Sequence, residues 1–132
     1  MQITLESDYA VRIVERLAQS GTRLDAHTIA QTTYVPLRFA LKILRKLVQA
    51  GLVKSYQGAK GGYQLSREPN EITLRQVIEA VEGPWRISRC VGDGYQCAHA
   101  PCRVHRVYEE ITDLVRQKLD SFTFEIPEEL QK

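Results

Sequence analysis

The chain has 132 residues, of which 43% are hydrophobic and 26% are charged, a composition typical of one globular domain or of a small domain with an appended helix. It has no apolar run of about 18 residues, and residues 1–8 lack the basic start and apolar stretch of a signal peptide. These features exclude a membrane-spanning helix and predict a cytoplasmic protein with no membrane partner.

The net charge of +2 hides an uneven distribution of charge along the chain. Seven of the 18 Lys and Arg residues lie between positions 26 and 67, and this stretch contains no Asp or Glu. A basic region of this kind indicates binding to a polyanion such as nucleic acid, through this part of the chain only.

The first predicted element is a helix with one buried face. Ser7 is a suitable N-cap, and Gly21 is a suitable C-terminal stop. Between them, apolar residues recur at helical spacing: Ala10, Ile13, Val14, Leu17 and Ala18. This helix is therefore expected to face the core.

A helix-turn-helix is predicted next. A short segment over residues 25–31 leads to a turn at residues 32–34, and Pro36 then begins a helix over residues 36–50 that Gly51 ends. We expect an inner face of Phe39, Ile43, Leu44, Leu47 and Val48, and an outer face of Arg38, Lys42, Arg45 and Lys46. Two helices joined by a tight turn, the second of them amphipathic and basic, are typical of DNA-binding domains.

A β-hairpin with a glycine-rich tip follows the second helix. The apolar residues change their period after Gly51 and bracket a loop at residues 57–62. Gly58 and Gly61 allow the backbone to approach a phosphate closely, and Lys60 adds positive charge at the tip. The hairpin is interpreted as a DNA-contacting wing, with a plain surface hairpin as the alternative.

A capping box marks the start of the next helix. Thr73 and Gln76 have the required spacing, Ile72 and Val77 are placed to form a hydrophobic staple, and the helix is expected to run to about Glu82. A loop with little capacity for regular structure then covers residues 89–100, because it contains two glycines between its cysteines.

All three cysteines of the chain cluster here, at Cys90, Cys97 and Cys102, and His105 lies one helical turn beyond the last. In a reducing cytosol an odd number of close cysteines favours metal or redox chemistry over disulfides. An iron–sulfur cluster, a structural zinc site of three cysteines and His105, and a metal-free thiol switch all remain open. No third orienting residue points to a thiol enzyme using Cys102 and His105, so no enzymatic activity is predicted.

A long amphipathic helix is predicted from near Pro101. Its apolar stripe comprises Val104, Val107, Tyr108, Ile111, Leu114, Val115, Leu119 and Phe122. So small a domain cannot bury a stripe of this length, which favours pairing with a second copy across a two-fold axis. A homodimer also suits a sequence-specific DNA-binding protein, since two recognition helices about 34 Å apart can enter successive major grooves of the DNA.

The predicted fold class is therefore mainly α with a small β-hairpin wing, as a winged helix-turn-helix with a long C-terminal dimerisation helix. Residues 1–83 are assigned to the DNA-binding domain, residues 84–101 to a cysteine-rich loop that binds the cluster, and residues 102–132 to the dimerisation helix and tail.

With these elements in place, the chain resembles the IscR/NsrR family of bacterial iron–sulfur winged-helix transcription regulators. The matching residues are MQIT at 1–4, DYA at 8–10, GLV at 51–53, GAKGGYQL at 58–65, and the three cysteines. The resemblance implies dimers that bind double-stranded operator DNA and a [2Fe-2S] or [4Fe-4S] cluster held by the three cysteines. It further implies that loss or oxidation of the cluster is the regulatory signal. The regulator is expected to be a repressor.

The resemblance leaves two candidates for the fourth ligand. His105 follows Cys102 by three positions, as in the histidine-ligated members, and Asp8 matches the carboxylate that nitric oxide-sensing members supply from the partner subunit. Six residues separate Cys90 from Cys97 but only four separate Cys97 from Cys102. This uneven spacing leaves the number of irons open.

We predict DNA contacts at Arg38, Lys42, Thr28, Tyr34, Lys60, Gly58 and Gly61. An arginine on the outer face of a recognition helix can read guanine with two hydrogen bonds. The wing residues are expected near the minor groove or the backbone, and Thr28 and Tyr34 near phosphates. Packing of Tyr34 against Phe39 is the alternative for that side chain.

Overall fold

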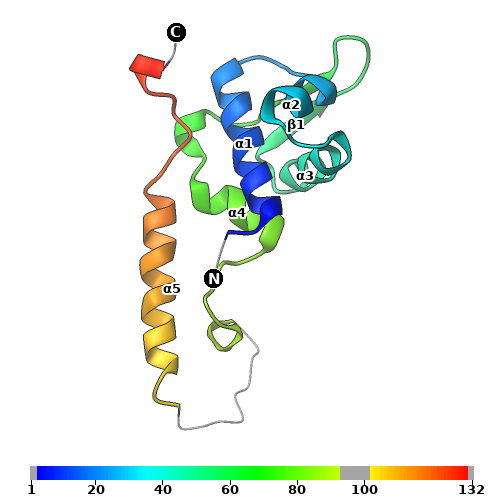
Figure 1. Ribbon diagram of the computed structural model, residues 1–132. Helices are drawn as coiled ribbons and strands as arrows, with labels where there is room; N and C mark the ends of the chain where they lie inside the picture. Colours follow the sequence, from blue (N-terminus) through cyan, green and yellow to red (C-terminus); the bar gives the residue numbers. More distant parts are fainter. Residues whose placement is uncertain (1–2, 93–101, 131–132) are drawn as a thin grey trace.

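The structure is a computed structural model that describes residues 3–92 and 102–130, and it is mainly helical (Figure 1). Its elements are, in chain order, α1 Leu5–Ser20, α2 Ala26–Thr33, α3 Leu37–Gln49, β1 Val53–Tyr56, β2 Gly62–Leu65, η1 Pro69–Glu71, α4 Leu74–Glu82, η2 Arg89–Val91, α5 His105–Asp120 and η3 Glu128–Leu130. The two strands form one antiparallel hairpin. The elements and their order agree with the predicted fold class.

Helix α1 supplies the centre of the core. All five residues of its predicted apolar stripe are buried, and Gly21 ends the helix in the left-handed conformation with φ of 66°. The predicted N-cap was wrong, because Thr4 and not Ser7 caps the helix, accepting a hydrogen bond from the Ser7 backbone N–H at 3.1 Å. Starting one turn earlier buries Ser7, whose hydroxyl donates to Glu82 Oε1 at 3.2 Å and ties α1 to α4.

Helices α2 and α3 form the predicted helix-turn-helix. The Asp25 side chain caps α2, and Tyr34, with φ of 58°, ends it in the left-handed conformation. The inner face of α3 is built from Ala40, Ile43, Leu44 and Leu47. Phe39 was predicted on this face but is 42% exposed, because fully buried Ala40 takes the core position and Phe39 lies about 100° away around the helix axis. Its ring instead approaches that of Tyr9, with centroids 6.3 Å apart.

The hairpin of β1 and β2 has a third short chain segment beside it. Tyr56 pairs with Gly62 within the hairpin, and Leu24 bridges to Tyr63 on the other side of β2. A Cβ atom at Gly62 would lie 2.6 Å from the Leu24 carbonyl oxygen. Glycine is therefore required here by the approach of two backbones, and Gly62 also has φ of 145°.

The C-terminal part of the chain leaves the core and then returns to it. Helix α5 lies along one side of the molecule (Figure 1), and Thr112 is its only buried residue. The helix begins at His105, later than expected, and Phe122 lies beyond its end. The helix ends before Phe122 because Phe124 is 1% exposed and its N–H donates to the carbonyl oxygens of Pro69 and Ile72, so that the chain turns off the helix axis into the core.

No helix in the described part of the chain is long and apolar enough to cross a membrane.

The capping box of α4 is confirmed, and it generates a stability prediction. The Thr73 side chain accepts from the Gln76 N–H at 3.1 Å, and the Gln76 side chain accepts from the Thr73 N–H at 2.9 Å. Replacing Thr73 with Ala removes the acceptor of the Gln76 N–H and should lower the free energy of unfolding by about 1 kcal/mol. Urea denaturation measures the loss. Thr73→Ser keeps the hydroxyl and should stay close to wild type; equal loss in both variants would contradict a capping role.

Candidate DNA-binding surface and cysteine site

The outer face of α3 carries three exposed cations. Arg38, Lys42 and Arg45 are exposed, and none of them forms an ion pair with a residue in ranges 3–92 and 102–130. The Arg38 guanidinium lies 5.4 Å from the centroid of the Phe39 ring. Their charges are thus free to meet an anionic ligand.

Lys46, predicted on the same outer face, has a different role. Its ammonium forms an ion pair with Glu6 of α1 at 2.8 Å and donates to the Val81 carbonyl oxygen of α4 at 3.3 Å. The side chain is half-buried. Lys46 therefore fastens α3 to two other helices, a contact that the helical period alone does not reveal.

The turn before α3 exposes an aromatic ring. Tyr34 is 86% exposed, and Phe39 is engaged with Tyr9, so the alternative packing of Tyr34 against Phe39 is not observed. Thr28 is half-buried within α2, where its N–H donates to the Asp25 carboxylate at 2.7 Å. This hydrogen bond is the main cause that lowers the pKa of Asp25.

The glycines of the wing tip have two different environments. Gly58, with φ of 93°, has open space where a side chain would be, and Lys60 beside it is exposed. A Cβ atom at Gly61 would collide with the Tyr56 carbonyl oxygen, so the turn itself requires this glycine. The wing and α3 lie on the same side of the molecule, away from α5 (Figure 1). We refer to the exposed Arg38, Lys42 and Arg45 of α3 together with Lys60 of the wing as the cationic surface.

A cysteine and a histidine meet where η2 packs beside α5. The Cys90 thiol lies 3.3 Å from the Ser88 hydroxyl oxygen, and hydrogen bonding to Ser88 and then to His105 lowers its pKa. The pKa of His105 is raised, mainly by Cys90 and next by Glu109, whose Oε1 lies 2.7 Å from His105 Nε2. A cysteine sulfur beside an imidazole that a carboxylate orients is a pair of donors suited to a soft or borderline metal.

The other predicted ligands are only partly described. Cys102 is a half-buried free thiol, and Cys97 lies outside the described residues. Asp8 is on α1, where its carboxylate forms an ion pair with Arg12 at 2.8 Å. Within residues 3–92 and 102–130, no group of three or more His, Cys, Asp or Glu side chains is placed to hold a metal ion. The described chain thus brings Cys90 and His105 together and leaves Asp8 with another partner.

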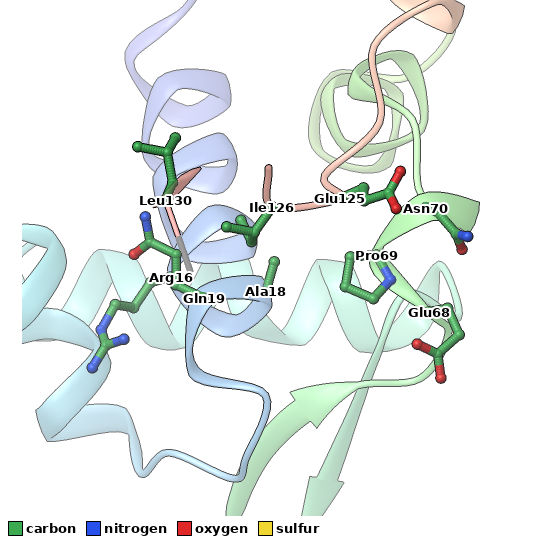
Figure 2. Close-up of a pocket in the computed structure, with 9 residues that line it drawn as sticks. All are labelled: Arg16, Ala18, Gln19, Glu68, Pro69, Asn70, Glu125, Ile126 and Leu130. Carbon is green, nitrogen blue, oxygen red and sulfur yellow. The ribbon is translucent and has the colours of Figure 1, made fainter. Parts of the chain in front are cut away.

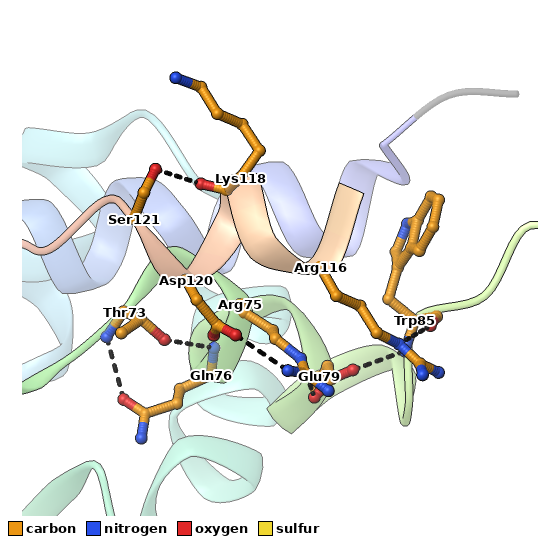
Figure 3. Close-up of polar contacts among 9 residues, drawn as sticks. All are labelled: Thr73, Arg75, Gln76, Glu79, Trp85, Arg116, Lys118, Asp120 and Ser121. Atoms are coloured by element: carbon orange, nitrogen blue, oxygen red, sulfur yellow. Dashed lines mark hydrogen bonds and ion pairs between the residues drawn. The ribbon is translucent and has the colours of Figure 1, made fainter. Parts of the chain in front are cut away.

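A polar network that the sequence analysis missed joins α4, the segment before η2, and α5 (Figure 3). The Glu79 carboxylate accepts from the Trp85 N–H at 2.7 Å and pairs with Arg75 at 3.2 Å. Arg75 also pairs with Asp120 of α5 at 2.9 Å, and Arg116 Nε of α5 donates to the Trp85 carbonyl oxygen at 2.7 Å.

One further hydrogen bond extends this network toward the cysteine site. The Ile87 N–H donates to Oγ1 of buried Thr112 in α5 at 3.3 Å. Residues 85–90 are therefore held between α4 and α5. Both contacts of Trp85 are made by its backbone atoms, so no side-chain pattern in the sequence indicates them.

A separate open cavity of about 750 Å³ lies near the C-terminal end of α1 (Figure 2). It is lined by Arg16, Ala18, Gln19, Glu68, Pro69, Asn70, Glu125, Ile126 and Leu130. None of these residues belongs to the cationic surface or to the cysteine site, and the lining contains no thiol or imidazole.

Known proteins with similar sequences are transcriptional regulators. The model of the Rrf2 family, described as an iron-dependent transcriptional regulator, matches residues 3–126. The HTH-type transcriptional regulator CymR of Bacillus subtilis is 32% identical over 127 residues, which are 95% of this chain and 88% of that protein. An HTH-type regulator of Mycobacterium tuberculosis is 34% identical over 96 residues, and the match spans only 60% of its length.

Solved structures agree with the fold. The structure of CymR, described as the global cysteine regulator of B. subtilis, has a TM-score of 0.77 and 31% identity, covering 95% of this chain and 94% of that one. The structure of T. potens IscR has a TM-score of 0.75 and 26% identity, covering 94% of this chain and 83% of that one. The family consists of transcriptional regulators and not of enzymes. The chain belongs to the Rrf2 family of winged-helix transcriptional regulators.

Proposed function

We propose that this chain is a cytoplasmic homodimeric repressor that binds double-stranded operator DNA and senses iron–sulfur status, redox state or nitric oxide through an iron–sulfur cluster. The observation that carries the sensing proposal is the contact between Cys90 and His105, which joins the cysteine loop to the first residue of α5. In this proposal residues 1–83 read DNA, residues 84–101 bind the cluster, and residues 102–132 hold the dimer together.

The DNA interface is assigned to the cationic surface of α3 and the wing. Arg38 and Lys42 project from an exposed helix face with unpaired charge, which suits base edges and phosphates in a major groove. Lys60 and Gly58 lie at an open wing tip, where a phosphate can approach the backbone. Gly61 supports this tip by allowing its tight turn. Thr28 of α2 and Tyr34 in the turn before α3 are proposed to contact phosphates, and the exposure of Tyr34 supports this role.

The apolar side of α5 supports a dimer. Val104, Val107, Leu114 and Phe122 are exposed large apolar residues on or next to this helix, and Leu114 is 65% exposed. Contiguous exposed apolar surface on a small protein marks an interaction site. Pairing of two α5 helices across a two-fold axis would cover these side chains and set the separation of the two α3 helices.

The donor set fits an iron–sulfur cluster. Cys90, Cys97 and Cys102 supply three thiolates, and the lowered pKa of Cys90 favours the ligating form. His105 is the fourth ligand that we favour, because it already contacts Cys90 within one chain, whereas Asp8 pairs with Arg12 and would have to come from the partner subunit. A [2Fe-2S] or [4Fe-4S] cluster held by these residues would supply iron–thiolate bonds that are sensitive to oxidants and nitric oxide.

The network around Glu79 provides a route from the cysteine loop to the DNA-binding surface. Trp85 is hydrogen-bonded to α4 and α5 and Ile87 to α5, and α4 in turn accepts a hydrogen bond from Lys46 of α3 through Val81. A change in the order of the loop therefore acts on elements that position the recognition helix.

A metal-free thiol switch is the second candidate function. The observation that favours it is the lowered pKa of half-buried Cys90, since a thiolate is the form that oxidants attack. A structural zinc site bound by the three cysteines and His105 has the same donors but predicts DNA binding that does not respond to oxidants.

Replacing Arg38 with Ala should weaken binding to an operator selected from a random library by about 1–3 kcal/mol, because one set of hydrogen bonds to a base edge is lost. Fluorescence anisotropy measures the affinity. Lys118→Ala, which removes an exposed charge in the last turn of α5, is the matched control. Equal affinity of Arg38→Ala and wild type for the operator would show that Arg38 is not part of the DNA interface.

Protein purified without oxygen should be brown, contain iron and sulfide, and change its DNA affinity after exposure to air or nitric oxide. Visible absorbance, metal analysis and anisotropy on one preparation measure these properties. A colourless protein with about one zinc per chain and constant DNA affinity would establish the structural site instead. A metal-free protein whose affinity changes on oxidation would establish the thiol switch.

The identity of the fourth ligand is tested by two matched variants. His105→Ala should change the visible spectrum of the anaerobic protein and accelerate cluster loss, because the intrachain donor is removed. Asp8→Ala should leave the spectrum unchanged. The opposite result would identify the partner subunit's carboxylate as the ligand.

A further inference from the structure

A tight stack of an arginine on a tyrosine lies at the base of the wing. The Arg23 guanidinium carbon is 3.4 Å from the centroid of the Tyr56 ring. Two other arginines of the chain lie near rings at 5.4 and 5.7 Å, so the Arg23 contact is the closest of the three. At 3.4 Å the planar cation is in van der Waals contact with the centre of the ring, which is a cation–π arrangement.

The fold explains how these two side chains meet. Arg23 lies between α1 and α2, next to Leu24, which exchanges two hydrogen bonds with Tyr63 of β2 at 2.8 and 3.0 Å. Tyr56 is the last residue of β1, on the other side of β2, and its partner in the hairpin is Gly62. Two strand spacings are about 10 Å, a distance that the long side chains of Arg23 and Tyr56 span together to reach their 3.4 Å contact.

The charge of Arg23 is not neutralised by this contact. Arg23 is exposed and forms no ion pair with any residue in the described part of the chain. The acid nearest to it in sequence, Asp25, accepts the hydrogen bond that caps α2. A stacked guanidinium keeps its N–H groups in the plane of the cation, where they can donate at its edges.

Arg23 lies close in the fold to the wing residues that are proposed to contact DNA. Tyr56 immediately precedes the loop that carries Lys60, and Arg23 lies outside the basic stretch at residues 26–67, so the sequence pattern did not include it. We propose that Arg23 contacts the DNA backbone beside the wing, and that Tyr56 is a positioning residue that holds it there. This inference rests on the proposed function, because it requires that the wing meets DNA.

A phosphate is the expected partner, rather than a base edge. An arginine that reads a base must extend into a groove, and Arg23 cannot do so without leaving the Tyr56 ring. A guanidinium fixed at the surface of the sheet instead presents two parallel N–H donors, the geometry that binds phosphate oxygens. Fixing the side chain before binding also reduces the entropy lost on complex formation.

The test measures affinity for DNA against salt concentration. The probes are the selected operator and a duplex of equal length with shuffled sequence, and the proteins are wild type, Arg23→Ala, Tyr56→Leu, Tyr56→Phe and the double variant Arg23→Ala/Tyr56→Leu. Arg23→Ala should weaken binding to both duplexes by about 3- to 10-fold and reduce the slope of log K against log salt by about 1. Lys118→Ala again controls for the loss of one charge.

The Tyr56 variants separate positioning from charge. Tyr56→Leu should weaken binding in wild type although no charge is lost, and it should add little in the Arg23→Ala background, because the two residues act as one unit. Tyr56→Phe keeps the ring and should bind like wild type. Thermal unfolding of each variant confirms that the hairpin is intact.

Two outcomes overturn the inference in distinguishable ways. If wild type binds DNA but Arg23→Ala matches Lys118→Ala, or if the effects of Arg23→Ala and Tyr56→Leu simply add, Arg23 is not a positioned backbone contact and the proposed function stands. If wild type binds neither duplex, the proposed function fails, and this inference fails with it.

Discussion

The packing of helix α1 into the centre of the core is the constraint on which the other elements depend. Ala10, Ile13 and Val14 are completely buried, and α2, α3 and α4 all contact this helix. Burial of apolar surface is the dominant stabilising term in a domain of this size, so the three helices are held at fixed positions around α1. The cationic face of α3 points outward because its opposite face is used for this packing.

Polar contacts then fix how the helices are oriented around that core. Thr4 and Ser7 of the α1 start meet Glu82 at the end of α4, and Lys46 joins α3 to both helices. These contacts are partly exposed, so each of them contributes modestly to stability. Their importance is geometric, because they link the recognition helix to the helix that precedes the cysteine loop.

The C-terminal segment is anchored at both of its ends. Its start lies at His105 beside Cys90, and its end lies at Phe124 in the core. Between these anchors, α5 contacts the rest of the chain through Thr112, Arg116 and Asp120, and part of its apolar stripe, including Val107 and Leu114, stays exposed. The proposed pairing of α5 with a second copy would therefore involve a helix that stays connected to the cysteine site.

The sequence by itself determined the helix-turn-helix, the wing and the capping box, because caps, turns and hydrophobic periods act over a few neighbouring residues. It also located the clustered cysteines and the outer cations of α3. Only the tertiary structure decided that Lys46 links α3 to two other helices, that Phe124 enters the core, and that Arg23 stacks on Tyr56. These contacts join residues far apart in the chain, so no local pattern encodes them, and the packing of α1 and the hairpin brings them together.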